Sequence, residues 1–142
     1  SLEAEKKIFK SILLLQPTSP LRSIYDYDGL CKIFDKDVEL AVSVKEAKSN
    51  PYFNLFEETE KGYLEKSKAS NYERRQDAPL VYEYNGSMYL ANITALKKYG
   101  LHGMKKIRKM VMPEKRSIDI DDENDWQVAL SYYNLFKNDE SL

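Results

Sequence analysis

Short apolar runs alternate with amphipathic stretches along most of this chain. Ser11–Leu15 (SILLL) is a continuous apolar run with polar flanks, which predicts a buried central strand. Further strands are predicted over 38–44 and 107–112, further helices over 24–34 and 94–99, and the end of a charged helix over 3–10. A last helix is predicted over 123–137, because apolar residues recur there at helical spacing: Trp126, Ala129, Leu130, Tyr133 and Phe136. Strands that alternate with helices predict an α/β sandwich with a mostly parallel sheet.

The middle of the chain breaks this alternation. Residues 45–79 are polar, aromatic and irregular, which predicts an excursion with one or two short hairpin strands that serves as a functional loop or an oligomer contact. Residues 81–90 (VYEYNGSMYL) contain the turn signal Asn85-Gly86, so this stretch is either a hairpin or a buried loop that feeds a strand. Ser117–Asp121 is predicted to be a short strand or the end of one.

Composition narrows the classes of partner. The 142 residues have the length of one domain, and a net charge of −1 gives no overall field to attract nucleic acid or an anionic membrane. We therefore expect small molecules or protein surfaces as partners. No apolar run approaches the roughly 20 residues that span a bilayer. One cysteine excludes an internal disulfide framework and suits a reducing cytoplasm, and one histidine excludes a multi-histidine zinc site.

Five of the ten residues in 117–126 (SIDIDDENDW) are acidic. If this stretch begins as a strand, Asp119 and Asp121 share one face, and two carboxylates so close repel each other unless a cation lies between them. Mg²⁺ is usually held by one or two carboxylates together with substrate phosphates. The alternative is a helix start, with Asp121 or Asp122 as N-cap and further acids in the first turn. The spacing alone favours the helix start, and the two interpretations are compatible.

Three other stretches carry groups suited to a ligand. In Gln16–Arg22 (QPTSPLR) two prolines stiffen the loop, so Arg22 could clamp a carboxylate or phosphate, or simply end an ordinary turn. The adjacent arginines of 73–79 (ERRQDAP) suggest an anion site or a solvated charge run. Asn85 offers both a donor and an acceptor beside a glycine, although the sequence alone favours a plain type I′ hairpin turn.

Taken together and in this order, ILLLQPTSPLR, ERRQDAP, NGSMYL and SIDIDDENDW resemble the acylneuraminate cytidylyltransferase family, the CMP-sialic acid synthetases and their relatives for other nonulosonic acids. The resemblance is to the C-terminal two-thirds of the family's domain. It implies a three-layer, nucleotide-diphospho-sugar transferase-like sandwich and a Mg²⁺-dependent nucleotidyltransferase. Such an enzyme joins CTP to a nine-carbon α-keto acid sugar, giving a CMP-sugar and pyrophosphate. The resemblance also implies a homodimer, in which the excursion at about 45–80 reaches the partner's sugar site.

The motifs also carry residue roles by resemblance. Asp119 and Asp121 match the family's metal-binding aspartates and would act in catalysis. The expected substrate-binding residues are Gln16, Ser19, Arg22, Arg75, Gln76, Asn85 and Tyr89.

Two features depart from the family pattern. Nothing here resembles the basic, glycine-containing loop that cradles the triphosphate after the family's first strand. The N-terminal nucleotide-binding part is therefore absent from the resemblance, and we expect no turnover by this chain alone. Where sialic acid synthetases often have a basic residue after a proline, this chain has Phe53 or Asn54, which leaves legionaminate- or pseudaminate-like sugars open. The alternatives are a non-catalytic dimerisation or interaction module derived from the family, and an unrelated Mg²⁺-dependent enzyme.

Overall fold

The computed structural model describes residues 9–137, so most of the charged helix predicted over 3–10 lies outside the described residues. The chain divides into two compact units. The larger unit contains the described residues of Ser1–Lys45 and Tyr84–Leu142, and the smaller unit is Glu46–Glu83. Between residues 9 and 137, no helix combines the length and the apolar character needed to cross a membrane.

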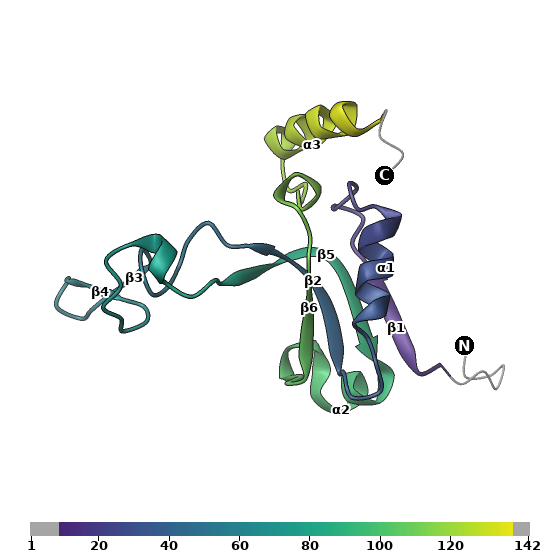
Figure 1. Cartoon of the computed structure of the whole chain (residues 1–142), viewed down its shortest axis with the longest axis horizontal. Helices are drawn as coiled ribbons and strands as arrows, with labels where there is room; N and C mark the ends of the chain where they lie inside the picture. The colour runs from purple at the N-terminus through teal and green to yellow at the C-terminus, as the bar shows by residue number, and fades with distance from the viewer. Residues whose placement is uncertain (1–8, 138–142) are drawn as a thin grey trace. The chain divides into compact units, whose positions relative to one another are not determined.

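The larger unit is built on a four-stranded sheet with the order β1-β5-β2-β6 (Figure 1). Its strands are β1 (Ser11–Leu15), β2 (Leu40–Glu46), β5 (Tyr82–Asn92) and β6 (Ile107–Val111). β1 pairs antiparallel with β5, and β2 pairs parallel with β6. β5 also runs antiparallel to β2, because Asn92 lies opposite Glu39 and Met88 lies opposite Ser43. The sheet is therefore mixed.

The prediction of a mostly parallel sheet is wrong for this part of the chain. A parallel neighbour requires a crossover, usually a helix, that returns the chain to the starting edge of the sheet. Between β2 and β5 the chain instead runs through the smaller unit and re-enters the sheet in the opposite direction. Only the pair of β2 and β6, whose connection includes α2 (Ile93–Gly103), is parallel among the described strands.

Three α-helices confirm the helices predicted from periodicity: α1 (Ile24–Lys32), α2 and α3 (Glu123–Phe136). Each begins at a side chain that accepts a hydrogen bond from the first turn. Ser23 and Asp122 do so within reciprocal capping boxes for α1 and α3, and Asn92 caps α2. These local signals explain why the helix starts lie close to their predicted positions.

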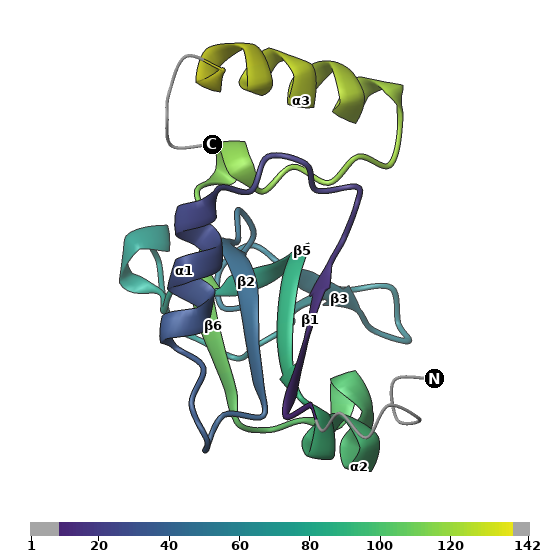
Figure 2. The same ribbon diagram turned by 90° about the vertical axis from the view of Figure 1, so that its right-hand side faces the viewer.

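Apolar side chains gather on both faces of the sheet. On one face, Leu30 of α1 packs in a cluster with Met88 and Met112. On the other face, Ala95 of α2 packs in a cluster with Val42 and others from β2 and β5. Figure 2 shows α1 lying along the face formed by β2 and β6, and α2 near one end of the sheet. Helices thus contact both faces, and the complete three-layer sandwich stays a prediction.

The strand β1 forms as predicted, but it is not central. Among the residues that the structure describes, it pairs with β5 alone and lies at the edge of the sheet. Its apolar residues point to both faces: Leu13 packs against the α1 side, while Ile12 and Leu14 are 49% and 50% exposed. The expectation of a buried central strand is wrong within the described residues, because β1 lies at an edge and two of its apolar side chains are half exposed. That expectation came from the apolar run, which is typical of a strand covered on both faces.

Two further local predictions, one of a turn and one of a strand, are also corrected. Asn85-Gly86 does not close a hairpin, because β5 continues through it as one strand of 11 residues, with Gly86 at a φ of 76°. Ser117–Asp121 is not a strand. A 3₁₀ turn, Glu114–Arg116, ends at Ser117, whose backbone N–H donates to the carbonyl of Glu114 rather than to a neighbouring strand. The residues that follow are irregular up to α3.

The smaller unit contains an antiparallel hairpin, as predicted for the excursion. Its strands are β3 (Phe56–Glu58) and β4 (Leu64–Lys66). Gly62 takes a φ of 78° in the turn, a backbone conformation that side chains disfavour. Tyr52 and Tyr72 meet edge to face, with ring centroids 6.3 Å apart.

Leu30 provides a test of the core on the α1 side. Leu30→Ala should lower the free energy of unfolding by about 2–5 kcal/mol, because the side chain is fully buried and its removal leaves a cavity. Leu135→Ala is the control, since Leu135 is 66% exposed and its loss should cost less than about 0.5 kcal/mol. Urea denaturation measures both. Equal effects would show that the described core is wrong.

Candidate functional site

Two loops that are about 100 residues apart in the sequence lie against each other in the larger unit. They are Gln16–Arg22, which follows β1, and Ser117–Asp121, which precedes α3. The backbone N–H of Ile120 donates to the carbonyl of Thr18 at 2.9 Å. The hydroxyl of Ser19 donates to Asp119 Oδ1 at 3.5 Å. The fold therefore brings together two of the motifs that the sequence singled out.

Arg22 holds the first loop in shape. One terminal nitrogen of its guanidinium donates to the carbonyls of Gln16 at 2.8 Å and Ser19 at 2.7 Å. Burial lowers the pKa of Arg22, although an arginine stays charged at neutral pH. Arg22 therefore binds two backbone carbonyl groups of its own loop. Its predicted contact with a substrate anion stays a prediction.

Gly86 marks the point where side chains from both loops converge. A Cβ atom at this position would lie 2.4 Å from Gln16 Oε1 and 3.2 Å from Asp119 Oδ2. The Gln16 oxygen is buried and has no hydrogen-bond partner within residues 9–137. Two acceptor oxygens therefore face the same small space, one neutral and one charged. Such an arrangement suits a bound cation or a hydrogen-bond donor.

The acids of the second loop divide between two roles. Asp122 is the N-cap of α3, and the carboxylate of Asp125 accepts hydrogen bonds from the backbone N–H groups of Asp121 and Asp122. This confirms the helix-start interpretation for these residues. Asp119 points instead toward Ser19 and Gly86, whereas Asp121 is exposed. No group of three or more His, Cys, Asp or Glu side chains with metal-binding geometry occurs in the described part of the chain.

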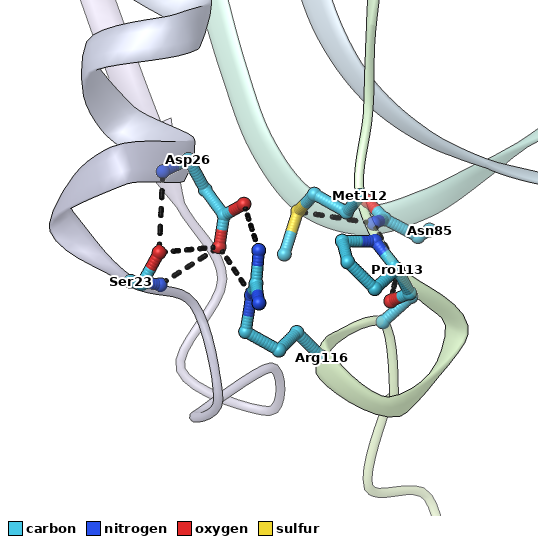
Figure 3. A network of polar contacts seen from close by, with 7 residues as sticks. Ser23, Asp26, Asn85, Met112, Pro113 and Arg116 are labelled. Carbon is cyan, nitrogen blue, oxygen red and sulfur yellow. Dashed lines mark hydrogen bonds and ion pairs between the residues drawn. The ribbon is translucent and has the colours of Figure 1, made fainter. Parts of the chain in front are cut away.

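Asn85 lies in a buried polar network rather than at an open surface (Figure 3). Its Oδ1 accepts from the hydroxyl of Ser43 at 2.7 Å and from the backbone N–H of Ser87 at 3.2 Å. Its Nδ2 donates to Ser117 Oγ at 2.9 Å and to the sulfur of Met112 at 3.2 Å. These four contacts use the full capacity of the amide. Asn85 therefore joins β2, β5 and the start of the second loop, and its predicted contact with a sugar stays a prediction.

An ion pair connects the same region to α1 (Figure 3). Arg116 donates two hydrogen bonds of 2.9 Å to the carboxylate of Asp26, which also accepts from the backbone and hydroxyl of Ser23. Burial by itself would raise the pKa of Asp26. The hydrogen bonds from Arg116 and Ser23 outweigh that effect, so the pKa of this carboxyl lies below its usual value.

Tyr89 packs in the core cluster on the α2 side and meets Tyr84 edge to face, with ring centroids 6.1 Å apart. Burial, then the electrostatic interactions with Tyr84 and Asp119, raise the pKa of Tyr89. This residue is therefore electrostatically linked to Asp119 as well as packed in the core. Its predicted role in sugar binding stays a prediction.

Arg75 and Gln76 belong to the smaller unit, where they line a cavity of about 330 Å³. Its other lining residues are Glu46, Ala47, Asn50, Ala78, Leu80 and Val81. Arg75 donates to the carbonyl of Ala47 at 3.4 Å, and Arg74 pairs instead with Asp77 at 2.8 Å. The second arginine of the motif thus faces a cavity, while the first closes a local ion pair.

The chain is similar in sequence to known proteins. No family model matches the chain. The chain is 31% identical over 125 residues to post-translational flagellin modification protein B of Campylobacter coli, a match that covers 85% of this chain and 52% of that protein. It is 35% identical over 96 residues to the CMP-N,N'-diacetyllegionaminic acid synthase of Campylobacter jejuni subsp. jejuni serotype O:2, covering 66% of this chain and 40% of that protein. The chain is homologous to the cytidylyltransferase family. It spans about half the length of the curated relatives it matches, or less.

Sequence reasoning missed several residues of this cytidylyltransferase homologue. Asp26 and Arg116 form their ion pair across 90 positions, and Ser43 and Ser117 complete the network around Asn85. The Ser-x-x-Asp spacing of 23–26 is a capping-box signal that could have located Asp26. Nothing local to Arg116 or Ser43 indicates a distant partner, so only the fold could find them.

Gly86→Ala tests the convergence of the two loops. The positive φ should lower the free energy of unfolding by about 1–3 kcal/mol, and the added Cβ should displace the Gln16 amide, which is the flexible end of its side chain. Gly100→Ala is the control, because Gly100 has a φ of 65° and a Cβ added there would meet nothing within 4 Å. Both variants should lose stability in urea denaturation, and only Gly86→Ala should shift the side-chain amide resonances of Gln16. Unchanged Gln16 resonances in Gly86→Ala would contradict the convergence.

The Asp26–Arg116 pair predicts a pH dependence. Because the folded-state pKa of Asp26 lies below its unfolded value, the pair contributes stability that is fully present above the unfolded pKa of about 3.9. That contribution is lost as the pH falls through the lower folded pKa. Asp26→Asn should flatten this acid limb of the stability curve. Asp35→Asn, which removes an exposed partner of Arg108, should change it much less. The same acid limb in wild type and Asp26→Asn would contradict the prediction.

Proposed function

We propose that this chain is part of a nucleotidyltransferase that couples CTP to a nonulosonic acid and releases a CMP-sugar and pyrophosphate. The observation that carries the proposal is the meeting of Gln16 and Asp119 at Gly86, with Ser19 donating a hydrogen bond to Asp119. These residues come from the two most specific motifs of the resemblance, QPTSPLR and SIDID. The relationship to a CMP-N,N'-diacetyllegionaminic acid synthase supports the same reaction and a legionaminate-like sugar.

The proposed cofactor is Mg²⁺. Asp119 supplies a carboxylate and Gln16 a buried, unpartnered carbonyl oxygen, and oxygen donors are the ligands that Mg²⁺ prefers. Few protein ligands suffice, because substrate phosphates usually complete the coordination. Bound there, the ion would neutralise charge that develops on phosphate oxygens. Asp121 is exposed in the same loop and is the second proposed ligand.

The chain's own residues would bind and orient the sugar. Gln16 is positioned by a loop whose carbonyls Arg22 gathers, and Ser19 donates toward Asp119. In the smaller unit, the cavity that Arg75 and Gln76 line together with Glu46 offers the guanidinium of Arg75 to a carboxylate or phosphate. A homodimer is part of the proposal through the family, and a cytoplasmic location is part of it through the single cysteine. The alternative function is a non-catalytic dimerisation or interaction module.

The test is a pyrophosphate-release assay on the complete natural gene product that contains this sequence, with CTP, Mg²⁺ and N,N'-diacetyllegionaminic acid. Wild type should turn over, and the double variant Asp119→Ala, Asp121→Ala should lose at least about a thousandfold in kcat/KM while staying folded. Asp122→Ala is the control, because it removes only the α3 cap, worth about 1 kcal/mol. No turnover by wild type would favour the interaction module, and an active double variant would refute the metal role.

A further inference from the structure

We propose that Arg116 and Asp26 are positioning residues: their ion pair fixes the start of the Ser117–Asp121 loop and thereby holds Asp119 against Gln16 and Gly86. This inference deepens the proposed function and rests on it for the role of Asp119. The placement of the loop itself can be measured without any activity.

Asp119 needs support from its neighbours in the chain. The hydrogen bond that reaches its carboxylate, from Ser19, is long at 3.5 Å and is therefore weak. On its C-terminal side, the loop is tied to Thr18 through the N–H of Ile120. On its N-terminal side, the ties are Arg116 and Ser117. The position of Asp119 is thus set by anchors on both sides of it.

The ion pair of Arg116 with Asp26 has better hydrogen-bond geometry than the contact of Ser19 with Asp119. Both carboxylate oxygens of Asp26 accept from the guanidinium at 2.9 Å, and such paired, charge-assisted bonds fix orientation as well as distance. The side chains are 22% and 5% exposed, so solvent screens the pair little. Asp26 is itself held by Ser23 within the capping box of α1. Asp119 follows Arg116 by three residues, so its Cα atom is at most about 11 Å from that of Arg116. The ion pair therefore limits where Asp119 can lie.

The pair also couples the two loops of the site at their bases. Asp26 lies in the first turn of α1, four residues after Arg22 closes the Gln16–Arg22 loop. Arg116 lies three residues before Asp119. The ion pair therefore connects the end of one loop to the start of the other, as Figure 3 shows for the side chains. A change at either member should move Asp119 without touching a ligand.

Amide hydrogen exchange in the 142-residue chain tests the placement. In Arg116→Gln, exchange of the Ile120 N–H, which donates to Thr18, should accelerate at least about tenfold relative to the Asn92 N–H, which donates to Glu39 at the other end of the sheet. Arg116→Lys keeps the charge without the paired geometry and should fall between wild type and Arg116→Gln. Arg108→Gln, which breaks the exposed pair with Asp35, should leave the ratio unchanged.

Two results would overturn the proposal. Equal acceleration of the Ile120 and Asn92 amides would show that the pair contributes only to global stability. An unchanged Ile120 amide would show that the loop does not depend on the pair. If Arg116→Gln does not fold, Asp26→Asn and Arg116→Lys provide the same comparison. In the double variant Asp26→Asn, Arg116→Gln, the exchange ratio should match that of Arg116→Gln. Either change alone already breaks the Asp26–Arg116 ion pair, so the second change has no further effect on it.

Titration with paramagnetic Mn²⁺ measures whether Asp119 is held where it can bind a metal ion. The wild-type amide resonance of Gly86 should broaden on titration with Mn²⁺, and Arg116→Gln should need at least about tenfold more of the ion for the same broadening, with partial recovery in Arg116→Lys. The titration is made on the complete natural gene product with CTP present, which supplies the phosphate ligands. If the wild-type resonance then does not broaden, the metal part of the proposed function fails, and the exchange measurement still decides the positioning role. Equal titrations for wild type and Arg116→Gln would refute positioning of Asp119.

Discussion

The buried amide of Asn85 is the interaction on which the arrangement of the larger unit depends. Its oxygen and nitrogen are both enclosed, and each unsatisfied buried polar group costs about 1–3 kcal/mol. Ser43 on β2 and Ser117 at the start of the acidic loop supply the required partners. The loop therefore has to begin where Ser117 reaches Asn85. The position of the candidate site follows from a requirement of the core.

The glycine next to Asn85 meets a second requirement. With a φ of 76°, Gly86 breaks the regular extension of β5, and its missing side chain leaves room for Gln16 Oε1. A β-branched residue, which strands usually favour, would fill that space and resist the backbone conformation. One strand thus provides core residues along its C-terminal half and a place for polar groups at its centre. The sequence shows the Asn85-Gly86 dipeptide. It does not show that Asn85 is buried in a hydrogen-bond network or that Gly86 leaves space for Gln16.

Local sequence signals predicted the helices and strands, whereas contacts between distant residues determined how the strands pair and how Asn85-Gly86 folds. The helix starts at Ser23 and Asp122 could be found because a capping box is written within four residues. The run SILLL was correctly predicted as a strand, but its neighbours depend on pairing across the chain, which periodicity does not encode. Asn85-Gly86 has the composition of a hairpin turn, yet the buried contacts of Asn85 outweigh that local preference.

The oxygens at Gly86 limit what the site can bind. Gln16 Oε1 has no donor within the described residues, and Asp119 presents a carboxylate to the same space. An anion placed there alone would meet two acceptors and be repelled. A cation would satisfy both oxygens at once, and a sugar hydroxyl or amide could satisfy either by donating a hydrogen bond. An anionic phosphate therefore needs a metal ion between itself and these residues, whereas a neutral sugar group does not. In the proposed function, these two oxygens would accept a hydrogen bond from the sugar or bind the metal ion, and a phosphate would reach Gln16 Oε1 through that ion.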